Sequence, residues 1–214
     1  MTDPAHAMVY ETGPFFVETD AMFVPQPVSG GPWDPGLLHG GPVGGLLAHL
    51  VESVSSPTPV RICRHTVDMM RGVPMSPLRS EVEVLRAGRR IQVVRASLFD
   101  GAAEVAPSTS LRMRVAEVAS PLAPVRTAHP EDGPHQMLAQ PSWLSMADVG
   151  VPAFLRAVEF RREGEFRSGA PGLVWMRMHN TMVAGHDASP FVRLSTMADM
   201  TSMAAQYLDH EEWA

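Results

Sequence analysis

The chain has little of what several protein classes need. One cysteine, Cys63, in 214 residues excludes an internal disulfide and a cysteine-based zinc site, and we expect its side chain to be buried in a strand. The formal net charge of −6 argues against a nucleic-acid groove or binding to an anionic membrane. The longest uncharged apolar run, at residues 42–51, is far too short to span a bilayer. These absences favour a globular protein of the reducing cytoplasm.

Common kinds of catalytic apparatus are also missing from the sequence. No Gly-x-Ser-x-Gly motif marks a serine nucleophile. The nine histidines are scattered without the spacing of metal ligands, so we expect neither a metal nor another cofactor. The first residues lack the basic and apolar regions of a secretory signal. What is present, an apolar fraction of 45%, indicates a globular protein with a substantial core.

The hydrophobic pattern predicts an α+β protein built from two similar parts. In the first part, a strand at residues 8–17 precedes a buried helix at residues 42–54. Four strand-like segments follow, at residues 60–71, 79–86, 91–99 and 109–115. Residues 117–150 contain five prolines and little periodicity, which is typical of a linker.

The second part repeats the order of the first. Residues 156–166 and 172–183 are predicted strands, and residues 190–208 are a predicted helix with Leu194, Met197 and Ala198 on its apolar face. We therefore expect an N-terminal unit at residues 1–116, a linker at 117–150 and a C-terminal unit at 151–214. Few residues follow the second helix, so we expect the second unit to lack its last strands. Further chain or a partner would complete its sheet, and we expect a homo-oligomer.

The start of the first predicted helix is the segment that carries most chemical information. His39, Gly40 and Gly41 precede Pro42, and proline suits a first turn because no N–H is needed there. The free N–H groups and the positive end of the helix dipole suit a carbonyl oxygen or an anion. Glycine at both positions would let a ligand approach the backbone, although tight packing would need glycine as well.

Several segments together resemble a known family. They are Trp33, the glycine-rich run at residues 39–45, the strand at 64–72, the hairpin at 86–99 and the run Met197-Ala198-Asp199-Met200. They resemble the thioesterase II-like family of acyl-CoA thioesterases. The resemblance implies an α+β double hotdog, in which two long core helices are each wrapped by an antiparallel sheet. The second hotdog would be incomplete at its C-terminal end.

The resemblance also implies an activity, the hydrolysis of acyl-CoA thioesters to a free acid and CoA. Asp199 would orient or deprotonate the attacking water, and the backbone N–H groups of Gly40 and Gly41 would stabilise the oxyanion. His39, Trp33 and Ser202 would contact the substrate.

The two predicted helices look complementary. The first has Ala48 and His49 where related single-hotdog enzymes carry a carboxylate, and the second has Asp199 but no His-Gly-Gly start. We therefore expect one working site between the two halves. The family completes this site with a Ser or Thr and a Gln on strands that would follow Ala214.

Two other functions remain open at this stage. The chain would be a non-catalytic acyl-CoA-binding protein if the pocket persists without the chemistry. It would be an enoyl-CoA hydratase of hotdog fold if Asp34 and His39, five residues apart, supply the acid and base. A purely structural role for His39 and a solvent-facing position for Asp199 are the simpler alternatives.

Overall fold

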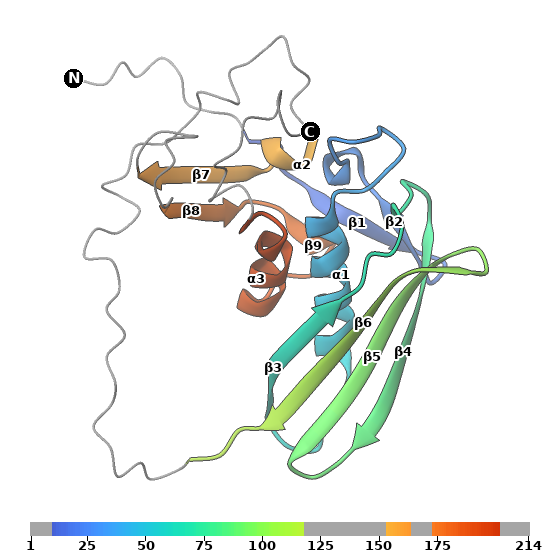
Figure 1. Ribbon diagram of the computed structural model, residues 1–214, viewed down its shortest axis with the longest axis vertical. Coiled ribbons are helices and arrows are strands. Elements are labelled where there is room, and N and C mark those ends of the chain that lie inside the picture. The colour runs from blue at the N-terminus through green and yellow to red at the C-terminus, as the bar shows by residue number, and fades with distance from the viewer. Residues whose placement is uncertain (1–9, 118–152, 164–172, 202–214) are drawn as a thin grey trace.

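The computed structural model describes residues 10–117, 153–163 and 173–201 (Figure 1). The first part comprises β1 (Pro14–Thr19), β2 (Met22–Pro25), the 3₁₀ helix η1 (Pro27–Ser29), α1 (Gly40–Ser53), β3 (Val60–Val67), β4 (Leu78–Ala87), β5 (Ile91–Asp100) and β6 (Ala103–Arg114). The second part comprises α2 (Ala153–Arg156), β7 (Val158–Glu163), β8 (Leu173–Met178), β9 (Thr181–Val183) and α3 (Pro190–Ala198). Within these ranges, no helix combines the length and the hydropathy needed to cross a bilayer.

Seven strands form one sheet in the order β3-β6-β5-β4-β2-β1-β9. The neighbours are antiparallel except for β1 and β9, which run parallel. The long strands β4, β5 and β6 follow one another through short connections, and β3 pairs with β6 at one edge. The hairpin between β4 and β5 turns at residues 88–90, in the interval predicted from the sequence.

Helix α1 lies against the concave face of this curled sheet (Figure 1). Ten of its residues are buried, from Gly41 to Val51 with the exception of His49. A helix that is apolar on all sides is covered on all sides, and here the sheet covers one side and α3 another. The fold is therefore an α+β hotdog, a core helix wrapped by an antiparallel sheet.

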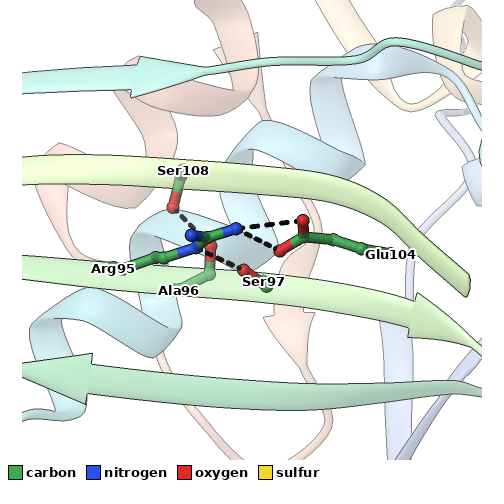
Figure 2. Close-up of polar contacts among 5 residues, drawn as sticks. All are labelled: Arg95, Ala96, Ser97, Glu104 and Ser108. Atoms are coloured by element: carbon green, nitrogen blue, oxygen red, sulfur yellow. Dashed lines mark hydrogen bonds and ion pairs between the residues drawn. The ribbon is translucent and has the colours of Figure 1, made fainter. Parts of the chain in front are cut away.

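The outer face of β5 and β6 carries polar side chains instead (Figure 2). Arg95 donates to both carboxylate oxygens of Glu104, at 2.7 and 2.9 Å, and its Nε lies 3.3 Å from Ser97 Oγ. A cavity of about 590 Å³ lies on this face and includes Glu81, Arg95 and Glu104 in its lining. None of the residues predicted to act on a substrate lines it.

The described elements of the second part pack onto the first. Strands β7 and β8 form a separate antiparallel pair, whereas β9 joins the large sheet beside β1. Helix α3 packs against α1 in the antiparallel sense, because Gly40 lies beside Asp199 and Glu52 lies beside Ser189. In each part an antiparallel strand pair precedes a core helix, whereas the sequence predicted a single strand ahead of the first helix.

Several element boundaries differ from the prediction. The predicted first strand, residues 8–17, is replaced by two strands, β1 and β2, and residues 172–183 likewise form two strands rather than one. The predicted linker lies outside the described residues apart from residue 117, as do the predicted helical residues 202–208. Cys63, expected to be buried, is exposed because side chains alternate along β3 and Cys63 lies on the face opposite to Ile62.

Candidate active site

The site begins at the N-terminus of α1. His39 is the N-cap residue with an extended backbone (φ −70°, ψ 144°), and its Nδ1 accepts a hydrogen bond from Gly41 N–H at 3.1 Å. The His39 N–H itself donates to the Ser29 carbonyl, which ties this turn to η1. The Gly40 N–H has no partner among the described residues. This N–H therefore remains open at the positive end of the helix dipole.

Asp199 follows the last residue of α3 and brings its carboxylate to this turn. Its Oδ2 lies 3.1 Å from His39 Nδ1. A Cβ atom on Gly40 would lie 2.8 Å from the same oxygen. Real Cβ atoms essentially never approach a neighbour so closely, so the carboxylate can occupy this position only because residue 40 is glycine.

The Nδ1 atom of His39 lies near two groups that require opposite protonation states of it. Nδ1 must be unprotonated to accept from Gly41 N–H, but it must carry the proton to donate to Asp199. A neutral imidazole therefore makes one of these bonds at a time. When the Nδ1–H tautomer donates to Asp199, the Gly41 N–H becomes free as well as that of Gly40. The hydrogen-bond partner of His39 Nδ1 therefore determines whether one or two backbone N–H groups are free at the start of α1.

The imidazole of His39 is held in a largely apolar setting. Its side chain is 11% exposed and stacks on Phe154, with 4.3 Å between ring centroids. Burial lowers the pKa of His39, and the charge of Asp199 acts in the opposite direction. The Asp199 side chain is 39% exposed, so water reaches it.

A groove of about 490 Å³ opens beside this pair. Gly40 and Gly44 of α1 line one side, and Leu194 and Asp199 lie on the α3 side. His65 and Val67 are among the β3 residues in its wall. The His65 Nδ1 lies 2.7 Å from Ser110 Oγ, and burial lowers the pKa of His65. A partly apolar groove that starts at a carboxylate and open backbone N–H groups suits a long, flexible ligand with a reactive carbonyl at one end.

One stretch of the chain matches a known family model. Residues 29–115 match the family model for the acyl-CoA thioesterase N-terminal domain. The match covers 87 of the 214 residues, and over this range the chain is similar to the acyl-CoA thioesterases. The matched range includes His39, Gly40 and Gly41 but ends well before Asp199. No curated protein sequence matches the chain.

Solved structures of hotdog proteins are similar in fold to most of this chain. A candidate thioesterase from Novosphingobium aromaticivorans is 22% identical with a TM-score of 0.63, and the alignment covers 89% of this chain and 73% of that one. An acyl-CoA thioesterase II from Mycobacterium marinum is 16% identical with a TM-score of 0.50, over 80% of this chain and 64% of that one.

A third structural relative is a hotdog protein of unknown function from Alicyclobacillus acidocaldarius. It is 14% identical, has a TM-score of 0.58, and is aligned over 85% of this chain and 64% of its own. This chain thus spans less than two thirds of the length of two of the three relatives. Identities this low establish the hotdog fold, and they leave substrate and mechanism to be argued from the site.

The other residues predicted for the thioesterase site are not found in the groove among the residues that the structure describes. Trp33 lies in the loop before α1 with 87% of its surface exposed, and it does not line the groove. Ser202 lies outside the described residues. Asp34, the acid of the hydratase alternative, accepts a hydrogen bond from Gly36 N–H at 2.7 Å, an exposed turn contact. The substrate-contact roles of Trp33 and Ser202 stay predictions.

The structure settles a packing role for Gly41 that the sequence left open, and it adds His65, which sequence reasoning missed. Gly41 lacks a Cβ that would meet Phe154 Cζ and the Thr196 carbonyl, each at 2.7 Å, so this glycine serves packing as well as hydrogen bonding. His65 lines the groove, but a single histidine in a strand gives no signal of that. In the described ranges, no three His, Cys, Asp or Glu side chains come together as a metal site would require.

Proposed function

We propose that the protein hydrolyses acyl-CoA thioesters to free acids and CoA. The observation that carries this proposal is the Asp199 carboxylate lying against Gly40 at the N-terminus of α1, at one end of the groove. The family match over residues 29–115 supports the substrate class, because thioesterases of this family act on acyl-CoA.

Asp199 activates the nucleophile in this proposal. Its carboxylate is partly exposed and beside the groove, where it can hold a water molecule and accept a proton as the water attacks the thioester carbonyl. The water adds directly, the C–S bond breaks, and the proton is delivered to the leaving thiolate. No covalent acyl-enzyme forms, so no serine or cysteine nucleophile is needed.

The start of α1 stabilises the charge that develops on the carbonyl oxygen. Gly40 N–H is open, and Gly41 N–H opens when the Nδ1–H tautomer of His39 donates to Asp199. Two aligned backbone donors at a helix N-terminus form an oxyanion hole. His39 acts as a positioning residue here, since its choice of partner both orients Asp199 and frees the second donor.

The test is thiol release from acyl-CoA esters of increasing chain length, comparing the wild type with Asp199→Asn. We expect the variant to lose about 10²- to 10⁴-fold in kcat, the range typical of a positioned acid or base. Asp187→Asn is the matched control, because Asp187 is an exposed aspartate outside the groove.

Each outcome of this experiment is informative. Equal loss in both variants would indicate a general charge effect rather than a role for Asp199. Full activity in Asp199→Asn would refute its assignment. Saturable acyl-CoA binding without any hydrolysis in the wild type would reject the proposed activity in favour of the non-catalytic alternative.

A further inference from the structure

A second cavity, of about 470 Å³, adjoins the groove at the end remote from Asp199. It lies where α1 and β6 end and where β3 and α3 begin. Ile62 of β3 and Phe191 of α3 line both spaces, so the groove and the second cavity adjoin along this strand and this helix. Nine residues of helical rise, about 13 Å, separate Asp199 from Pro190 at the second cavity. A ligand of that length would span both.

The second cavity is lined by a buried arginine. Arg112 is 4% exposed, and its register partner Ile62 in β3 is also turned toward the core. Its Nη2 donates to the Val54 carbonyl at 2.8 Å, at the C-terminal end of α1. In the part of the chain that the structure describes, its Nη1 has no hydrogen-bond partner and it forms no ion pair.

The contact with Val54 uses only the Nη2 atom of the Arg112 guanidinium. Tying down the last turn of α1 is a structural role, and a cation is favourable at that end of a helix. A single donor would suffice for it, whereas Arg112 keeps a second nitrogen buried and unpaired. Burial lowers the pKa of Arg112 and nearby Glu52 raises it, yet a guanidinium stays protonated in proteins. A buried charge without a partner is costly, so an anion at this place would be stabilised.

The other charged groups that line the cavity leave it positive. Arg61 contributes a second, more exposed guanidinium, and Glu52 contributes one carboxylate, which accepts from Ser189 Oγ. Two cations and one anion leave a surplus of one positive charge, in a chain whose net charge is −6. The N-terminus of α3, at Pro190, adds the positive end of a helix dipole.

We propose that this cavity binds a carboxylate at the far end of the acyl chain whose thioester lies at Gly40 and Asp199. The inference rests on the proposed thioesterase function. It predicts that the enzyme prefers ω-carboxyacyl-CoA to the unsubstituted acyl-CoA of the same length. The apolar side chains between the two ends, among them Val67, Phe191 and Leu194, suit a methylene chain. One surplus positive charge matches a single carboxylate better than the more highly charged CoA diphosphate, which Glu52 would repel more strongly.

The experiment compares decanoyl-CoA with its ω-carboxylated counterpart, the CoA monothioester of decanedioic acid. We expect a higher kcat/KM for the second ester in the wild type. Arg112→Gln and Arg61→Gln should each lower that preference about tenfold, the value of one hydrogen bond to a charged group, while decanoyl-CoA is still hydrolysed. Arg61→Gln keeps the test decisive if Arg112→Gln fails to fold, and Arg86→Gln in β4 is a control outside the lining of both spaces.

The same design separates the alternatives. A wild-type preference for decanoyl-CoA, or a preference unchanged in both arginine variants, overturns the proposal. The arginine variants could instead lower kcat/KM equally for both CoA esters and leave the N-acetylcysteamine thioesters unaffected. In that case the bound anion is the CoA diphosphate and the proposal is wrong.

Binding gives a readout independent of turnover. Calorimetric titration of Asp199→Asn with the two CoA esters should show tighter binding of the ω-carboxylated one. Failure of hydrolysis in the wild type with this binding preference intact would reject the proposed activity and keep the carboxylate site.

Discussion

His39 has one nitrogen for two partners, and this sets how the residues of the site depend on one another. The sequence suggested that His39 either contacts substrate or is structural, and that Asp199 either acts on water or faces solvent. Neither pair of alternatives includes a contact between the two side chains, because 160 positions separate them in the chain. That contact depends on how α1 and α3 cross, which local pattern does not encode.

The buried imidazoles predict how stability depends on pH. The pKa values of His39, His49 and His65 are lowered from 6.5, in each case chiefly by burial. Below pH 6.5 the unfolded chain therefore binds more protons than the folded one, so folding is favoured less as the pH falls. We expect the free energy of unfolding, measured by urea titration, to be highest above pH 6.5 and to decline below it.

A variant isolates the share of one histidine in this dependence. His39→Gln keeps a side-chain acceptor for Gly41 N–H but cannot titrate, so its stability should decline less steeply with falling pH than that of the wild type. A stability that rises as the pH drops from 6.5 would show that these histidines are not buried as neutral groups.

At the scale of elements, the sequence predicted types and order better than ends. The first hairpin was missed because its turn, Asp20-Ala21, has positive φ at both residues without the usual glycine. Strand β6 begins before its predicted start and runs through Pro107, which lies just beyond the last β3 pair, Val67 with Ser108. A proline there costs no hydrogen bond on the β3 side.

Helix α3 shows why a face can be predicted wrongly. Leu194, assigned to the packed face, is 66% exposed and lines the groove. The buried positions include Val192, Thr196 and Met197. Thr196 packs on the glycines of α1, so a small polar residue takes a core position that hydrophobic periodicity does not mark.

The glycines of α1 give a prediction about how this helix packs on α3. A Cβ on Gly45 would overlap Thr196 Oγ1 and Met182 Cε, whereas one on Gly44 would lie 3.3 Å from the Ser195 carbonyl. Alanine favours a helix over glycine, but overpacking a core typically costs about 1–3 kcal/mol. We expect Gly45→Ala to lower the free energy of unfolding by about that amount and Gly44→Ala to lower it less. Equal effects, or a more stable Gly45→Ala, would contradict the close packing.

At the scale of the whole molecule, the site exists because two halves of the chain share one core. Strand β9 extends the sheet of the first half, and α3 runs antiparallel to α1, so the end of one helix meets the start of the other (Figure 1). The sequence predicted the division of labour, with backbone donors on one helix and the acid on the other. It could not predict the polar cavity at Arg112, since a buried arginine in a strand has no pattern of its own.

The central claim is that Gly40 and Asp199 act together on one thioester. A double-mutant cycle tests it most directly, with kcat/KM for thiol release measured for the wild type, Gly40→Ala, Asp199→Asn and the double variant. Groups that work as a unit lose activity non-additively, so the double variant should be hardly slower than the slower single variant. Losses that simply multiply, or an unimpaired Gly40→Ala, would show that the two residues do not share a site of catalysis.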